Sequence, residues 1–309
     1  MTDKVSKIVF DILSFKKSAW AGEKFRDISG TIYGEESFPA IPPKNAEIGF
    51  ATDVGDGFRA GPGEWSAFLL SAVLALNDNR PAVLVELGSS QGLWCVPWIN
   101  TVALKHGEKY CLALGIEASS ALDKARDFWN LQNLDCRETF SGDELKIEGA
   151  NWKFIWLQRA VSGEKTVLYF PNIDIAANNG ANITSTPLPG HLQVESITPC
   201  GILEKIDAIL PDAEINLLHM DIQGAELDFI NSHEFTGLAG RTKCIALSTH
   251  GKRVELENIN IFTDMGFTLI CAEPSEFVGA DLVKDGIFVW LRNDSLNRAY
   301  NMGLITDER

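Results

Sequence analysis

Hydrophobic and polar positions alternate in blocks between residues 80 and 265, and the blocks follow two different periods. Short apolar runs rich in Val, Ile and Leu are typical of buried strands, and they are separated by stretches with apolar positions at helical spacing. The predicted strands are residues 83–87, 110–116, 153–159, 214–220 and 243–249, and the predicted helices are residues 93–105, 119–131, 202–210, 224–232 and 254–265. This alternation predicts an α/β fold with a doubly wound, mostly parallel, Rossmann-like sheet.

The remaining C-terminal pattern departs from simple alternation. Residues 160–197 predict short β segments around the polar loop 178–182, and residues 268–272 and 286–292 predict two further strands that form an antiparallel edge pair. Residues 294–309 are expected to be a loosely held tail. The chain is therefore divided into an N-terminal helix and cap, residues 1–79, a main domain, residues 80–293, and the tail.

The N-terminal pattern predicts a helix followed by an irregular cap. Apolar residues recur at helical spacing within residues 3–19 and lie beside lysines, which fits either association with a membrane surface or packing in a homo-oligomer or core. Residues 22–63 are rich in Gly and Pro and predict an irregular cap, whereas residues 64–78 predict a helix leading into the first strand.

Charge and cysteine usage narrow the function classes. The chain has 309 residues and a formal charge of −15, and it shows no basic stripe, so we expect no nucleic-acid partner. The six cysteines are scattered rather than paired as in zinc sites, which predicts a reduced, cytoplasmic protein. Lysines interrupt the apolar positions near the start, so we expect no membrane-spanning segment.

A glycine-bearing turn follows the first predicted strand, in residues 83–92 (VLVELGSSQG). Gly88 and Gly92 allow backbone angles closed to other residues and let a ligand approach the main chain, while the following helix offers free N–H groups. A lone Gly-x-x-x-Gly spacing is common, but here it lies between strand and helix, and Glu117 closes the next strand. The sequence therefore predicts a nucleoside-binding enzyme with its pocket at the carboxyl ends of the strands.

Five segments together resemble the FkbM-type S-adenosylmethionine-dependent methyltransferases. They are residues 83–92 (VLVELGSSQG), 115–118 (GIEA), 159–163 (RAVSG), 220–226 (MDIQGAE) and 285–290 (DGIFVW). The resemblance covers roughly residues 80–292 and implies a class I methyltransferase fold. Gln223 stands where the family typically carries an acidic residue, which removes any role for a carboxylate at this position.

The resemblance implies S-adenosylmethionine (SAM) as cofactor. Gly88, Ser89 and Gly92 are then expected to form the close-approach turn, and Glu86 is expected to contact the amino-acid head directly or through water. Glu117, at the end of the second strand, has the place and the chemistry to accept both ribose hydroxyls, as an acidic residue does in dinucleotide sites.

The resemblance also implies methyl transfer to a hydroxyl of a sugar, glycan precursor or secondary metabolite. His250 closes the fifth predicted strand and is the expected general base, because an imidazole needs little pKa adjustment near neutrality. Asp221 closes the fourth strand, and several roles are open for it. It is a candidate to orient His250, to hold the substrate hydroxyl, to bind cofactor or a divalent ion, or to cap the next helix. No metal is assigned, although His219, Asp221 and His250 offer a mixed N/O set, and Glu226 is expected to be structural.

Three other functions compete with methyl transfer. The fold can retain nucleoside binding in a non-catalytic regulatory or assembly subunit, which the Gln223 departure favours. An NAD-dependent oxidoreductase ranks lower, because the first turn lacks Gly-x-Gly-x-x-Gly and no Tyr–Lys pair is evident. A glycosyltransferase would require sugar-nucleotide binding, commonly with a metal and an Asp-x-Asp pattern, and residues 219–221 are not that pattern.

Overall fold

The computed structural model describes residues 13, 19–21, 24–34, 60–107, 109–172, 181–279 and 281–305. Apart from residues 13 and 19, the helix predicted for residues 3–19 lies outside this part of the chain, and so do residues 22–23 and 35–59 of the predicted cap. Within the described residues, no helix combines the length and the apolar character needed to cross a membrane.

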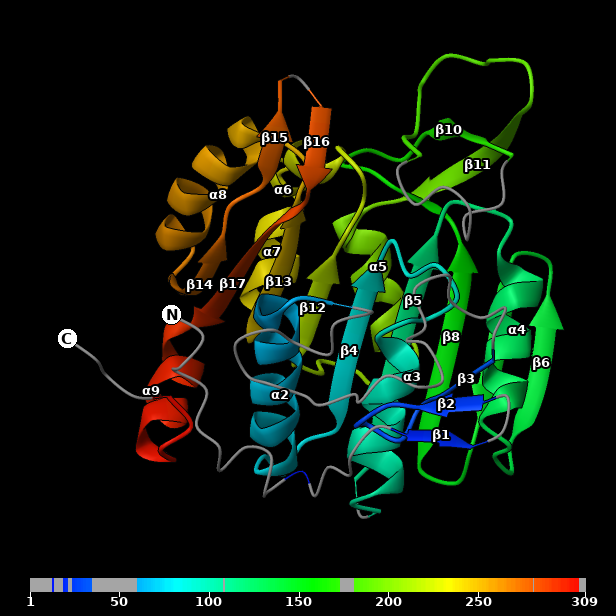
Figure 1. The fold of residues 1–309 in the computed structure, drawn as a ribbon, viewed down its shortest axis with the longest axis vertical. Helices are drawn as coiled ribbons and strands as arrows, with labels where there is room; N and C mark the ends of the chain where they lie inside the picture. Colours follow the sequence, from blue (N-terminus) through cyan, green and yellow to red (C-terminus); the bar gives the residue numbers. More distant parts are fainter. Residues whose placement is uncertain are drawn as a thin grey trace.

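A nine-stranded sheet forms the centre of the structure, with the order β14-β17-β13-β12-β4-β5-β8-β7-β6 (Figure 1). Its strands are β4 (Ala82–Leu87), β5 (Cys111–Glu117), β6 (Arg137–Ser141), β7 (Glu144–Glu148), β8 (Trp152–Gln158), β12 (Leu217–Met220), β13 (Cys244–Thr249), β14 (Phe267–Glu273) and β17 (Gly286–Arg292). The strands β13, β12, β4, β5 and β8 are parallel, whereas β17 is antiparallel to both β13 and β14. The predicted mostly parallel sheet with an antiparallel C-terminal pair is confirmed, and the fold is of the class I methyltransferase, Rossmann-like type.

Helices cover both faces of the sheet, as a doubly wound fold requires. One face carries α2 (Pro62–Leu76), α3 (Cys95–Trp98), the π-helix η2 (Ile99–Leu104), α4 (Leu122–Leu131) and α9 (Asn293–Asn301). The opposite face carries α5 (Pro199–Asp207), α6 (Glu226–Ile230), α7 (Phe235–Gly240) and α8 (Lys252–Asp264) (Figure 1). Every residue of β4 and β5 is buried, because their alternating side chains enter two cores, one on each face.

Two small β structures stand at the carboxyl edge of the sheet (Figure 1). The strands β9 (Ala160–Val161), β10 (Val167–Pro171) and β11 (His191–Ile197) form a three-stranded sheet, which confirms the short β segments predicted for residues 160–197. A hairpin of β15 (Glu276–Val278) and β16 (Asp281–Lys284) lies between β14 and β17 in sequence. Residues 178–180 of the predicted polar loop, residues 178–182, lie outside the described residues.

Two segments are more regular than their sequence predicts. The long connection at residues 132–150 contains β6 and β7, which pair antiparallel and extend the sheet beyond β8. The cap was expected to be irregular, yet β1 (Ala19–Ala21), β2 (Lys24–Arg26) and β3 (Ile32–Gly34) form a small antiparallel sheet. Tyr33 of β3 is fully buried, with its ring centroid 5.4 Å from that of Phe128 on α4, so this sheet is fixed by aromatic packing.

The expectation of a loosely held C-terminal tail is wrong for residues 294–305. Residues Asn293–Asn301 form α9, which packs against α2 and β17. Ala299 and Leu304 are fully buried and Ile305 nearly so, all within the core on the α2 face. Apolar burial therefore anchors this segment to the main fold.

A group of ion pairs joins the end of α2 to the amino ends of β4, β13 and the region before β12. Asp78 accepts from Arg80 Nη2 at 2.9 Å and from Lys243 Nζ at 2.6 Å, and Lys243 Nζ also lies 3.3 Å from Glu214. The side chains of Asp78 and Lys243 are only 11% and 8% exposed. Burial alone would raise the pKa of Asp78, but the bonds from Arg80 and Lys243 outweigh it and hold that pKa below its usual range.

We expect Asp78→Asn to lower the free energy of unfolding by about 2 kcal/mol at pH 7, because Lys243 stays buried without its nearest carboxylate. The pKa of Asp78 is lower in the folded protein than in the unfolded chain. Its carboxylate therefore stabilises the fold at pH values above the pKa of the unfolded chain, and this stabilisation is lost as the pH falls. Urea unfolding at pH 7 and pH 3 should therefore show that the difference in free energy of unfolding between Asp78→Asn and the parent is smaller at pH 3. Asp123→Asn, at a side chain 78% exposed, is the control and should show no such change; a constant Asp78→Asn gap would contradict the prediction.

Candidate functional site

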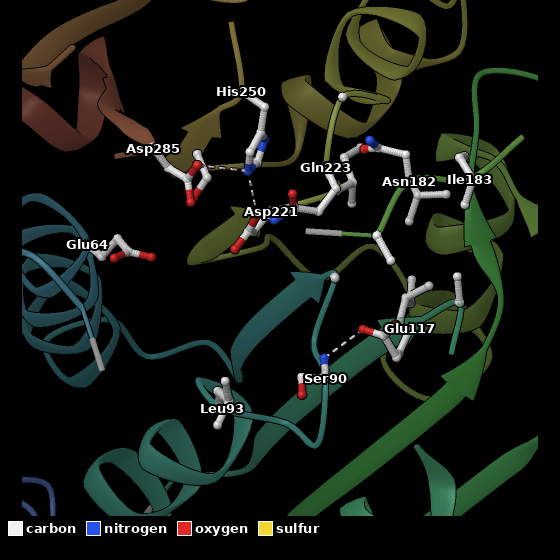
Figure 2. A pocket seen from close by; sticks show the side chains of 18 of the residues that line it. Glu64, Ser90, Leu93, Glu117, Asn182, Ile183, Asp221, Gln223, His250 and Asp285 are labelled. Atoms are coloured by element: carbon white, nitrogen blue, oxygen red, sulfur yellow. Dashed lines mark hydrogen bonds and ion pairs between the residues drawn. The ribbon is translucent and has the colours of Figure 1, made fainter. Parts of the chain in front are cut away.

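A cavity of about 840 Å³ opens at the carboxyl ends of the parallel strands. Its walls come from the turn after β4, the end of β5, the turn after β12, the end of β13 and the turn before β17. Figure 2 shows Glu117 and Ser90 on one side, Asp221 in the middle, and His250, Asp285 and Glu64 on the other side. The predicted location of the pocket at the carboxyl edge is thus where the structure has its cavity.

The turn after β4 is held in place by close contact with the turn after β12. Gly88 has a φ of 77°, and a Cβ atom here would overlap the backbone carbonyl oxygen of Asp221. Gly88 lines the cavity, whereas Ser89 is fully buried and faces Gly115, so its side chain does not reach the cavity. Gly92 also lies away from the cavity, where a Cβ would press on Phe154.

Ser90 takes the place in the cavity that the sequence analysis expected for Ser89. It adopts a φ of 49°, lines the cavity, and donates its backbone N–H to Glu117 Oε2 at 2.8 Å. The left-handed backbone at Ser90 turns the chain, which no residue-type pattern in the sequence indicates.

Glu117 closes β5 and lines the cavity, as expected from the sequence. Its two carboxylate oxygens accept backbone N–H bonds from Ser90 at 2.8 Å and Ser119 at 2.9 Å, which fix the side chain. Burial raises the pKa of Glu117 more strongly than these N–H bonds lower it. Each oxygen keeps a further lone pair, so the carboxylate can accept two hydroxyl groups from a ligand.

Glu86 does not line the cavity, in contrast to the expectation for it. The side chain is 1% exposed and accepts backbone N–H bonds from Trp94 and Cys95, both at 3.0 Å, at the start of α3. Burial raises the pKa of Glu86 to about 7, although the charge of His219 and the N–H bonds oppose the shift. Here Glu86 caps a short helix, because free N–H groups at a helix start attract a carboxylate.

His250 lies at the end of β13 among three carboxylates, and Figure 2 shows two of them, Asp221 and Asp285. Its Nδ1 is 2.7 Å from Glu226 Oε1, and its Nε2 is 3.3 Å from Asp221 Oδ1 and 3.6 Å from Asp285 Oδ1. Sequence reasoning placed His250 and Asp221 at adjacent strand ends, and the structure brings them together. No role was predicted for Asp285 from the sequence, although this residue begins the fifth segment of the family resemblance.

The protonation of His250 follows from these neighbours. Burial lowers its pKa, but the contacts with Asp221 and Glu226 outweigh burial and raise the pKa to about 10. At neutral pH the ring is therefore an imidazolium cation, which has no lone pair to accept a proton. The premise that His250 needs little pKa adjustment to act as general base does not hold for this arrangement.

The turn after β12 is organised by Gln223 and Glu226. Gln223, with a φ of 50°, donates its amide to Asp221 Oδ1 at 3.2 Å, so the amide at this position orients a carboxylate that a second acidic side chain would repel. Glu226 is fully buried and accepts from Gly224 N–H at 3.1 Å, consistent with the structural role expected for it. Asp221 makes no capping bond to α6, whose first residues lack a side-chain cap.

The alternative metal set of His219, Asp221 and His250 is divided between two clusters. His219 Nε2 lies 3.1 Å from Glu64 Oε1 on α2, and its ring packs 5.6 Å from that of Trp94. Within the described part of the chain, no group of three or more His, Cys, Asp or Glu side chains is placed to hold a metal ion. The cavity thus offers carboxylates, the imidazolium of His250, backbone groups, and the cationic side chains of Lys124, Arg159 and Lys284.

Comparison with known proteins gives one sequence relative and several remote structural similarities. No family model matches the chain. A protein of Jannaschia sp. (strain CCS1), described as "Putative methyltransferase", is 25% identical over 224 residues, which are 69% of this chain and 70% of that protein. Precorrin-6y C5,15-methyltransferase from Geobacter metallireducens GS-15 has 12% identity and a TM-score of 0.36, over 82% of this chain and 98% of that one. A "putative RNA methyltransferase" from Pyrococcus horikoshii has 11% identity and a TM-score of 0.35, over 77% and 88%.

The exclusion of nucleic acid as a partner, which rested on the acidic composition, is corrected. Solved structures similar to the chain include the one described as a "putative RNA methyltransferase", and overall charge alone does not exclude an RNA partner. At these TM-scores the similarity assigns no acceptor to this chain, and the fold assignment rests on the strand order itself.

Proposed function

We propose that this chain is a SAM-dependent methyltransferase. The observation that carries the proposal is Glu117, a carboxylate fixed by two N–H bonds at the end of β5, beside the Gly88 turn in a cavity of about 840 Å³. This is where an open α/β sheet binds a nucleoside, and a carboxylate there suits a ribose diol. The relative described as a methyltransferase supports the same activity.

The residues of the cavity fit the parts of SAM. Glu117 accepts the ribose hydroxyls, and the Gly88 turn admits the ligand close to the backbone. Leu93 and Ile116 line the cavity and offer apolar surface to a flat base. When bound, SAM supplies an electrophilic methyl group on a cationic sulfonium, and the acidic residues of the cavity favour that charge.

The finer proposal is transfer to a hydroxyl oxygen of a sugar, glycan precursor or secondary metabolite, in an enzyme of the FkbM type. Its support is the set of five matching segments, of which 220–226 and 285–290 supply Asp221 and Asp285 to one side of the cavity. Asp221 and His250 are proposed to hold the acceptor and to manage its proton. Residues 80–293 would form the methyltransferase domain, in a cytoplasmic protein with the segments before and after it.

Saturable binding of SAM and S-adenosylhomocysteine (SAH) is the expected result of titration calorimetry on the full chain, with NAD and a uridine diphosphate sugar bound at least a hundredfold more weakly. Transfer of label from methyl-labelled SAM to a panel of sugars, glycosides, RNA and small phenols then tests the finer proposal. Binding of NAD or the nucleotide sugar in place of the sulfur ligands would contradict methyl transfer. Binding of both sulfur ligands with no transfer to any acceptor class would favour the non-catalytic subunit.

A further inference from the structure

The imidazolium of His250 is enclosed on one side and faces the cavity on the other. On the enclosed side, the fully buried Glu226 contacts Nδ1. On the cavity side, Asp221 and Asp285 line the cavity and lie beside Nε2. The His250 side chain is only 8% exposed, and Nε2 has no hydrogen bond of good geometry within the described residues. A buried cation with one unbonded N–H therefore neutralises two carboxylates that also face the ligand space.

The other charges near this group are already paired with each other. On α8, Lys252 Nζ lies 2.9 Å from Glu255 Oε2. On β16, Lys284 Nζ lies 3.7 Å from Glu276 Oε1. Across the cavity, Glu64 accepts from His219. Among the residues that the structure describes, His250 is thus the cation within ion-pair distance of Asp221 and Asp285.

The order of the strands directs a bound cofactor toward this group. Glu117 ends β5 and Asp221 follows β12, and these strands flank β4, so the two carboxylates stand about two strand spacings, roughly 10 Å, apart. In SAM the sulfonium follows the ribose by one carbon. With the ribose at Glu117, the cofactor crosses the end of β4, and its charge moves toward Asp221 and Asp285.

We propose that Asp221 and Asp285 face the sulfonium of bound SAM, and that its positive charge replaces the proton of His250, which is released to solvent. This inference rests on the proposed function. The N–H bond at Nε2 breaks, its electron pair stays on the nitrogen, and no group is oxidised or reduced. His250 then carries a free lone pair when a methyl donor is present, and regains its proton when the product SAH, which lacks the positive sulfur, occupies the site.

The size of the effect can be estimated from Coulomb's law. A unit charge about 6 Å from the ring, at an effective dielectric constant of about 20, lowers the proton affinity of the imidazole roughly 100-fold. Because the pKa of His250 is raised to about 10 in the free protein, the ring is protonated at pH 8 without ligand. With SAM bound it would be about half deprotonated at this pH.

The test is calorimetric titration of the full chain at pH 8 in phosphate and in Tris, whose ionisation enthalpies differ. SAM binding is expected to release roughly half a proton more than SAH binding. His250→Gln should remove the difference while both ligands still bind. His233→Gln, an exposed histidine away from the cavity, is the matched control and should keep it.

A second variant tests the carboxylate independently of the histidine. Asp285→Asn should lower the preference for SAM over SAH about tenfold and leave the Kd for SAH within about twofold, because SAH has no charge to lose. Asp281→Asn, on the exposed hairpin strand β16, should change neither constant. Equal proton release by SAM and SAH in the parent would overturn the inference while leaving the proposed function in place. Failure of both ligands to bind the folded chain would overturn both.

Discussion

Gly88→Ala is expected to lower the midpoint of thermal unfolding by roughly 10 °C and to abolish SAM binding in the protein that remains folded. The new methyl group would overlap the carbonyl oxygen of Asp221, and the residue would have to keep a φ of 77°. The left-handed backbone costs about 1–2 kcal/mol, and forcing apart two packed turns adds about 1–3 kcal/mol. Thermal unfolding followed by circular dichroism gives the first result, and calorimetry gives the second.

Gly142→Ala is the matched control for this substitution. Gly142 lies in the turn between β6 and β7 with a φ of 62°, and nothing lies within 4 Å of the position of its Cβ. Alanine at position 142 has the backbone cost without the overlap. The midpoint of thermal unfolding should therefore fall by about half as much as in Gly88→Ala, or less. Equal losses at the two positions would show that the overlap with Asp221 adds nothing to the backbone cost, and would contradict the prediction for Gly88→Ala.

Glu117→Gln is expected to weaken SAM binding by ten- to a hundredfold. The amide removes the charge that strengthens hydrogen bonds from the ribose hydroxyls, and its NH₂ group faces one of the N–H donors of Ser90 and Ser119. Since burial raises the pKa of Glu117, the parent should also lose affinity as the pH falls, at a less acidic pH than an ordinary carboxylate would give.

Glu273→Gln is the control for Glu117→Gln. Glu273 also lines the cavity but belongs to β14, at the far edge of the sheet from β5. Its substitution should change the Kd for SAM by less than about threefold, because charges at such a distance interact weakly through solvent. A Glu117→Gln variant that is folded and binds SAM as tightly as the parent would remove this residue from the cofactor site.

Much of the fold follows from the sequence because parallel strands buried on both faces leave mostly apolar runs. The runs at β4, β5, β8 and β13 are such strands, and their order along the chain predicts their helices. β6 was missed for the opposite reason. All five of its residues are exposed, so it carries no apolar period, and only its pairing with β7 makes it a strand.

The candidate site could be predicted to the level of strand ends but not of side-chain directions. Glu117, Asp221 and His250 line the cavity as expected, since each closes a parallel strand. Glu86 lies within β4, one residue before its end, and its direction is set by the free N–H groups of α3. The contribution of Asp285 depends on a hairpin inserted before β17, and no local pattern fixes where such an insertion returns the chain.

The exposed outer strand β6 also determines how the sheet ends. One row of its backbone N–H and C=O groups pairs with β7, and the other row faces solvent. Arg137 and Glu138 begin this edge, and a strand from another molecule that docked there would have to remove both charged side chains from water. The protein therefore carries a built-in barrier at this edge against sheet-to-sheet aggregation, even though Phe140 on the same strand is 55% exposed.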